Sequence, residues 1–284
     1  MLAGIKDYQN THNFNRGKKL SFSDEIFFLK TGHRDWDSVI LDPAVKKEIR
    51  QNTVGFLKKC RQLERYGIPS RRGIILAGEP GTGKTTILKA LMSEAENITC
   101  VAAGAYGLLL DGFISSFFEI AQDLSPTIIF IEDIDLIGQI RDHFSRGTPA
   151  LLDLLAEQDG ISEKTAIVTI ATSNSLETLD KALRDRPSRF DRVFKITNPS
   201  REQRMEMIER MSEKIPLSEP VKEYIANATN GYTPAHLQEV LHVMVIAQDN
   251  IAENKIDFTK SDVELVIALI NFKQTARIGF NLPA

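Results

Sequence analysis

The chain has 284 residues, 42% of them hydrophobic, which is enough for one large domain or two smaller ones to bury a core. A formal net charge of −3 argues against nonspecific nucleic-acid binding through a basic face. No apolar run approaches the ~18 residues that span a bilayer. Cys60 and Cys100 lack metal-ligand spacing and the N-terminus lacks a secretory layout, so we expect a reduced, cytoplasmic protein without a membrane segment.

Residues 1–33 have the composition of a separate N-terminal extension. A polar stretch is followed by a predicted short helix over residues 24–30, which Ser23 would begin and Gly32 would end. The apolar side chains around this helix need a partner surface; they are Phe22, Ile26, Phe27, Phe28 and Leu29. Either the extension packs on the main domain, or it docks an adaptor or a substrate.

The segment Gly78–Thr85 matches the phosphate-cradling pattern G-x-x-x-x-G-K-[ST] at every fixed position. The apolar run 73–77 before it predicts a buried strand, and residues 86–94 predict a helix whose N-terminal N–H groups favour a polyphosphate. Lys84 is expected to reach the β and γ oxygens, and the Thr85 hydroxyl to ligate Mg²⁺. We therefore predict that ATP or GTP binds here, at Glu79, Pro80, Gly81, Thr82, Gly83, Lys84, Thr85 and Thr86.

Four more apolar runs predict strands, at residues 98–102, 127–131, 166–171 and 193–197. Helical patterns separate them. Continuous rather than alternating apolar strands indicate a parallel sheet covered by helices on both faces, and hence an α/β fold.

The strand over residues 127–131 runs directly into Glu132-Asp133-Ile134-Asp135. Acids at the carboxyl end of a buried strand lie where open α/β sheets bind their ligands. One carboxylate there can hold Mg²⁺ through its water shell, and its neighbour can orient an attacking water. The alternative is an acidic junction in solvent, which the phosphate loop about fifty residues earlier disfavours.

Four motifs in order, GEPGTGKT, IIFIEDID, TIATSN and ALRDRPSRFDR, closely resemble those of the AAA ATPases over residues 36–272. The resemblance implies a P-loop large subdomain over residues 34–198, with a five-stranded parallel sheet of order 5-1-4-3-2. It also implies a small all-α lid over residues 199–284, which the capping box Ser200-x-x-Gln203 would open. Such subunits form rings, usually hexamers, with ATP and Mg²⁺ at each interface.

The resemblance assigns roles to individual residues. Lys84 and Thr85 match the Walker A lysine and threonine, and Asn174 matches the sensor 1 residue near the attacking water. Arg186 and Arg189 match the paired arginines that reach the neighbouring subunit's nucleotide, although a solvated basic turn is the alternative. The resemblance also implies positions near the nucleotide at Val39, Ile40, Met211 and Ala235.

The acid pair departs from the usual family order. Most relatives have Asp-Glu, whereas Glu132-Asp133 is inverted, as in the mitochondrial inner-membrane AAA translocases that export the folded Rieske protein. We expect Glu132 to serve Mg²⁺ and Asp133 to serve the water. Because aspartate is one methylene shorter than glutamate, we also expect slow hydrolysis.

The substrate is harder to predict. Tyr106 aligns near the family's aromatic pore residue that grips a polypeptide, although a Tyr buried beneath neighbouring leucines fits equally well. We expect either a second pore loop or an ordinary solvated loop to contain Arg141, His143 and Arg146. The preferred function is an ATP-driven, chaperone-like remodeller of protein substrates. The alternative is a nucleotide-gated scaffold or nucleic-acid loader. The arginine motif disfavours a metabolic kinase. Any proteolysis would need a partner, because no H-E-x-x-H motif occurs.

Overall fold

The computed structural model describes residues 13–22, 26–29, 32–104, 107–110, 112–136, 154, 156–158, 160, 165–174, 190–248 and 258–275. The chain divides into two compact units. The first comprises Met1–Glu79 and Lys84–Ile196, and the second comprises Pro80–Gly83 and Thr197–Ala284.

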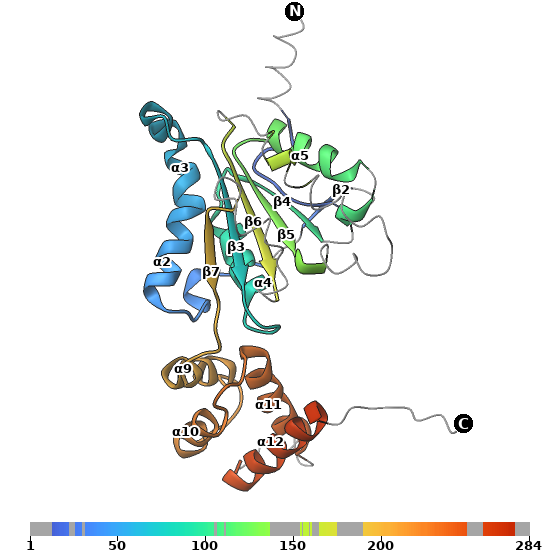
Figure 1. The fold of residues 1–284 in the computed structure, drawn as a ribbon. Coiled ribbons are helices and arrows are strands. Elements are labelled where there is room, and N and C mark those ends of the chain that lie inside the picture. Colours follow the sequence, from blue (N-terminus) through green and yellow to red (C-terminus); the bar gives the residue numbers. More distant parts are fainter. Residues whose placement is uncertain are drawn as a thin grey trace, which may run out of the picture. The chain divides into compact units, whose positions relative to one another are not determined.

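A seven-stranded sheet forms the centre of the first unit, in the order β2-β1-β4-β5-β6-β3-β7 (Figure 1). Its strands are β1 (Lys19–Phe22), β2 (Ile26–Phe28), β3 (Arg71–Ala77), β4 (Thr99–Gly104), β5 (Thr127–Glu132), β6 (Ile167–Ser173) and β7 (Arg192–Lys195). The five strands β7-β3-β6-β5-β4 are paired in parallel and confirm the predicted order 5-1-4-3-2. Strands β5 and β6 are buried along almost their whole length, as their unbroken apolar runs indicate.

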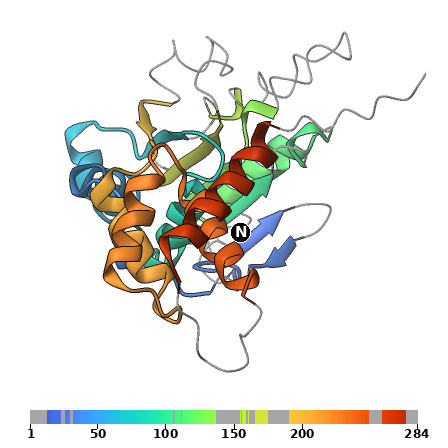
Figure 2. The same cartoon turned by 90° about the horizontal axis from the view of Figure 1, so that it is seen from below.

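The N-terminal region corrects two expectations. Strand β1 pairs in parallel with β4, and β2 pairs antiparallel with β1, so the sheet has seven strands rather than five. Figure 2 shows the two blue strands side by side. Residues 26–28 are therefore a strand where a helix over 24–30 was predicted. The physical reason begins with β1, whose Leu20 and Phe22 alternate into the core while the strand completes the hydrogen bonding of the β4 edge. Residues 26–28 then pair with the other edge of β1, which requires an extended chain.

Helices cover both faces of this sheet (Figure 1). They are α2 (Pro43–Asn52), α3 (Val54–Leu63), α4 (Lys84–Glu94) and α5 (Phe113–Asp123). Residues of α2, α3 and α4 share one buried cluster with the sheet, and residues of α5 share the other. Asp42 begins α2 by accepting the backbone N–H groups of Ala44 and Val45, with Pro43 in the first turn.

The second unit contains four described helices with their own core. They are α9 (Arg201–Met211), α10 (Glu219–Ala228), α11 (Pro234–Ile246) and α12 (Lys260–Thr275). The predicted capping box is present at the start of α9, between Ser200 and Gln203. Within the part of the chain that the structure describes, none of the helices is long and apolar enough to cross a bilayer.

Candidate functional site

Lys84 is the first residue of α4 and lies within the phosphate-loop segment, and its side chain turns back to the sheet. The Lys84 Nζ donates to the carbonyls of Gly78 at 2.7 Å and Glu79 at 3.0 Å, and to Asn174 Oδ1 at 3.0 Å. Burial lowers the pKa of Lys84, while the carboxylates of Asp133 and Asp135 act in the opposite direction. The ammonium is thus held where the carboxyl ends of β3 and β6 meet.

Asn174 connects this lysine to the acids that follow β5. The Asn174 Nδ2 donates to Asp133 Oδ1 at 3.1 Å, and its backbone N–H donates to Asp135 Oδ1 at 3.1 Å. This arrangement follows from topology, because β5 and β6 are neighbouring parallel strands whose ends lie together. The sequence predicted that Asn174 and Asp133 belong to one site, and the structure brings them into contact.

Two residues of this network were not predicted as site residues. Asp135 is only 5% exposed and receives the Asn174 N–H, and the Thr172 hydroxyl accepts the backbone N–H of Asp133 at 3.0 Å. That hydrogen bond holds Asp133 in a left-handed conformation with φ of 55°. Strand β5 ends at Glu132 and the chain turns at Asp133, so the period of an extended strand could not have placed Asp135; its only signal was its place in the acidic run Glu132–Asp135.

Glu132 has a different partner from Asp133, which contacts Asn174. Thr85 Oγ1 lies 3.4 Å from Glu132 Oε2, so the hydroxyl and carboxylate predicted as metal ligands are adjacent. One hydroxyl and one carboxylate, completed by waters and phosphate oxygens, form a donor set that Mg²⁺ favours. A hollow of about 380 Å³ adjoins these residues and is also lined by Ser21 and Leu29 from the N-terminal strand region.

The phosphate-loop glycines adopt conformations that other residues disfavour. Gly81 and Gly83 have φ of 80° and 96°, and the Gly78 N–H donates to the Ser173 carbonyl at 3.1 Å. Pro80–Gly83 groups with the second unit, where the Ala235 N–H donates to the Gly81 carbonyl at 3.3 Å. A Cβ on Gly81 would lie 2.8 Å from the Ala235 Cβ, so no larger residue fits without a shift.

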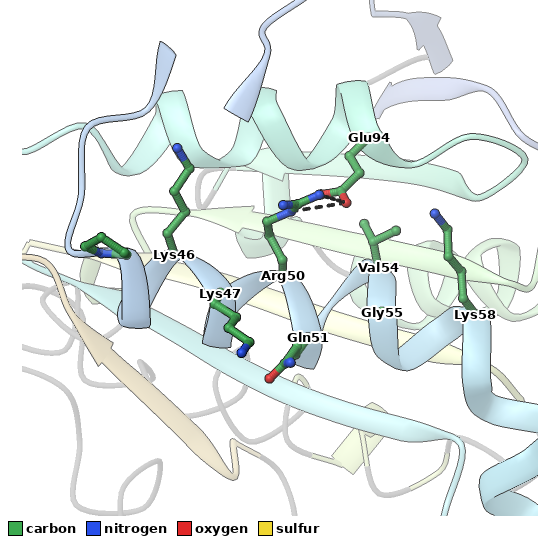
Figure 3. Close-up of a pocket in the computed structure, with 9 residues that line it drawn as sticks. Lys46, Lys47, Arg50, Gln51, Val54, Gly55, Lys58 and Glu94 are labelled. Atoms are coloured by element: carbon green, nitrogen blue, oxygen red, sulfur yellow. Dashed lines mark hydrogen bonds and ion pairs between the residues drawn. The ribbon is translucent and has the colours of Figure 1, made fainter. Parts of the chain in front are cut away.

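Val39 and Ile40, predicted to lie near adenine, belong to the first unit and lie just before α2. The Lys46 Nζ donates to the Val39 carbonyl at 3.1 Å, which fixes this segment on α2. A hollow of about 380 Å³ lies over α2 and α3, and Glu94 of α4 also lines it. Arg50 and Glu94 form an ion pair there at 2.6 Å (Figure 3). Met211 is half-buried at the end of α9 in the second unit. Adenine contact by these residues stays a prediction.

Several predicted site residues lie outside the described residues. These are Arg186 and Arg189, the pore-loop candidate Tyr106, and the loop residues Arg141, His143 and Arg146. The last arginine of the same motif, Arg192, is described; it begins β7 and lies 3.9 Å from Glu48.

Residues 74–198 match the model of the family described as "ATPase family associated with various cellular activities (AAA)". The chain is 34% identical over 229 residues to the ATP-dependent zinc metalloprotease FtsH 2 of Sphaerobacter thermophilus, covering 77% of this chain and 35% of that protein. It is 32% identical over 263 residues to FtsH of Cyanidium caldarium, covering 88% and 42%. It is 33% identical over 212 residues to the YME1 homolog of Schistosoma mansoni, covering 72% and 32%. The chain thus spans between a quarter and a half of the length of these relatives.

Proposed function

We propose that this chain, which belongs to the AAA family of ATPases, works in a ring of subunits that couples ATP hydrolysis to the remodelling or unfolding of protein substrates. Residues 74–198 are the ATPase domain, with ATP and Mg²⁺ as its cofactors. The similarity to ATP-dependent metalloproteases supports a protein substrate, because the names of those relatives state both ATP dependence and protease activity.

One observation carries the catalytic part of this proposal. The Lys84 ammonium, the Asn174 amide and the Asp133 carboxylate form a continuous hydrogen-bonded chain, with Thr85 and Glu132 as a separate pair. In the proposed roles Lys84 binds the β- and γ-phosphate oxygens, while Asp133 and Asn174 orient the attacking water. Thr85 and Glu132 hold Mg²⁺, which when bound neutralises charge on the phosphates.

The remaining charge stabilisation is proposed to come from the neighbouring subunit. Phosphoryl transfer through a loose transition state depends on positive charge around the γ-phosphate, and an arginine delivered in trans is worth about 10³–10⁵ in rate. Arg186 and Arg189 match the family's paired arginines and would supply that charge in a hexameric ring. In this assembly hydrolysis requires contact between subunits, so activity should depend on protein concentration.

The first test measures assembly and turnover together. Mass in solution is determined with and without ATP, and the ATPase rate is measured across protein concentrations for the wild type and for the Arg186→Ala/Arg189→Ala double variant. We expect ATP-dependent assembly and a loss of turnover in the variant. A monomer that turns over fully without both arginines would contradict the proposed ring mechanism.

The second test addresses the substrate. A carboxymethylated protein that cannot refold is added to the ring, and the ATPase rate is compared between Tyr106→Ala and the matched variant Tyr106→Phe. We expect the unfolded protein to stimulate the wild type and Tyr106→Phe, and to leave Tyr106→Ala at its basal rate. Stimulation by single-stranded DNA or RNA in place of the unfolded protein would favour a nucleic-acid loader.

A further inference from the structure

The hollow over α2 and α3 is lined mainly by two rows of residues that lie four apart in the sequence and run from one helix into the next. The first row is Lys46, Arg50, Val54 and Lys58, and the second is Pro43, Lys47, Gln51 and Gly55. Figure 3 shows Lys46 and Lys58 toward the two ends of this surface, with Arg50 between them. Among the described residues that line the hollow, Glu94 is the one acid. Four cations against one carboxylate leave an excess of positive charge here, in a chain whose net charge is −3.

Two of the four cations already have partners within the protein. Arg50 donates to the Glu94 carboxylate through Nε at 3.0 Å and through Nη2 at 2.6 Å. The Lys46 Nζ donates to the Val39 carbonyl at 3.1 Å. Lys47 and Lys58 are both exposed, and within the described part of the chain neither ammonium has a hydrogen-bond or ion-pair partner. The hollow therefore has two unpaired positive charges.

The separation of these two lysines indicates the shape of a ligand. Lys47 and Lys58 are eleven residues apart, which is at most about 16 Å along a helix that rises 1.5 Å per residue. One phosphate or one carboxylate can therefore neutralise only one of them at a time. About five or six residues of extended chain cover the same length at ~3.3 Å each, and every second side chain points to the same side. Acids at alternate positions of a peptide would thus present a row of carboxylates to the hollow.

The rest of the lining favours a peptide over other polyanions. Arg50 already binds a carboxylate, that of Glu94, in the two-pronged geometry typical of acidic-motif recognition. None of the described lining residues is aromatic, whereas single-stranded nucleic acids are held largely by bases stacked on aromatic rings. Val54, the branched apolar residue of the lining, is only 1% exposed, so it cannot enter a lipid surface as the apolar side chains of membrane-binding helices do.

We propose that the hollow over α2 and α3 is a docking site for an acidic segment of an adaptor or substrate protein, bound as about six residues of extended chain. Lys47 and Lys58 pair with carboxylates at the two ends of the segment, and the Gln51 amide hydrogen-bonds to the peptide between them. The proposal goes beyond the ATPase function and does not depend on ring assembly, because binding can be measured on the chain without ATP.

The test uses a fluorescein-labelled peptide in which four glutamates alternate with serines, and binding to the full chain is measured by fluorescence anisotropy at low ionic strength. The control ligand has glutamine in place of every glutamate. We expect saturable binding of the acidic peptide, at least tenfold tighter than binding of the glutamine peptide. The affinity should fall as salt is added, because exposed charges are screened. Equal affinity for the two peptides would overturn the proposal.

Two matched variants test whether the hollow itself binds the peptide. Lys47→Glu/Lys58→Glu reverses the two unpaired charges, and we expect it to weaken binding at least tenfold. Lys59→Glu/Arg61→Glu changes the net charge by the same amount at exposed positions of α3 that do not line the hollow, and we expect it to weaken binding less than about threefold. Equal losses in the two variants would show only general charge attraction and would overturn the docking site.

A third variant guards against a folding defect caused by new acids beside Glu94. Lys47→Gln/Lys58→Gln removes both charges without adding any, and we expect it to weaken binding at least fivefold while far-UV circular dichroism and Tm stay at the wild-type values. Its ATPase rate without peptide should also be unchanged. Wild-type affinity in this folded variant would show that the two lysines do not bind the segment.

Competition experiments identify the occupant. The unlabelled acidic peptide should displace the labelled one, whereas inorganic phosphate, oligothymidylate and phosphatidylserine vesicles at the same concentration of negative charge should not. Displacement by phosphate would assign the hollow to single anions. More effective displacement by oligothymidylate would assign it to nucleic acid, and by vesicles to a membrane surface. Each of these three results would overturn the proposed peptide.

Discussion

Lys84 Nζ lies 3.0 Å from Asn174 Oδ1, and the amide nitrogen of the same Asn174 lies 3.1 Å from Asp133 Oδ1. The two neighbours dictate the orientation of the amide, because an ammonium only donates and a carboxylate only accepts. A single neutral side chain therefore separates the phosphate-binding cation from the predicted water-orienting anion, and it holds both in place.

Replacing this amide should impair catalysis more than ATP binding. Asn174→Ala removes the link between Lys84 and Asp133, and we expect kcat to fall by about 10- to 100-fold as these groups lose their alignment. Asn174→Asp should be worse, because it places a second carboxylate beside Asp133. Calorimetric ATP affinity and steady-state kcat separate the two effects. A normal kcat in Asn174→Ala would show that the link has no catalytic role.

The inverted acid pair predicts different defects for its two members. Asp133→Asn should bind ATP and Mg²⁺ but hydrolyse at least about 10²-fold more slowly, because the water loses its orienting carboxylate. Glu132→Gln should instead raise the Mg²⁺ concentration needed for half-maximal turnover, since Glu132 lies beside Thr85. Mg²⁺ titrations of the ATPase rate distinguish the variants. If Asp133→Asn turns over at the normal rate, these role assignments are wrong.

The two cysteines should be inert in the folded protein. Burial raises the pKa of Cys60 to about 11 and that of Cys100 to about 12. Because the thiolate is the reactive form, a thiol reagent at pH 8 should modify neither cysteine in the native state and both in guanidinium. Fast labelling of either thiol without denaturant would contradict the burial.

The same thiols should make stability depend on pH in one direction. Unfolded cysteines lose their protons near pH 8.5, while the folded thiols keep theirs until about 11 and 12, so the folded state binds more protons in between. The free energy of unfolding should therefore fall as the pH rises above about 8.5. A Cys60→Ala/Cys100→Ala variant, measured by urea unfolding from pH 8 to 10.5, should show a shallower fall.

The central strands could be predicted because each is a local apolar run bounded by turns. The N-terminal strands could not be predicted in this way, as the pair Leu20 and Phe28 illustrates. These two residues pair in a local hairpin, but the pairing of β1 with β4, about eighty residues later, is a nonlocal contact. The apolar residues around Phe27 fit a short helix as well as a strand, and only the unpaired edge of β4 decides between them.

The site residues could likewise be predicted only where they belong to a local sequence motif. Lys84, Thr85, Glu132 and Asn174 were predicted because their types and spacing form motifs. Thr172 was not, since its contact with Asp133 depends on how β5 and β6 align, with Ile131 opposite Ala171. Contacts set by strand register leave no pattern within either strand alone.

The incorporation of β1 into the core predicts a sharp contrast between two N-terminal side chains. Leu20 is fully buried in the cluster beneath α5, whereas Phe27 on β2 is 53% exposed. Leu20→Ala should lower the free energy of unfolding by about 2–5 kcal/mol, because it removes buried methyl groups and leaves a cavity. Phe27→Ala, the matched control on the neighbouring strand, should change it by less than about 0.5 kcal/mol. Urea unfolding followed by circular dichroism measures both values. Equal, small effects would mean that residues 19–22 are an appendage to the domain, and the seven-stranded sheet would then be wrong.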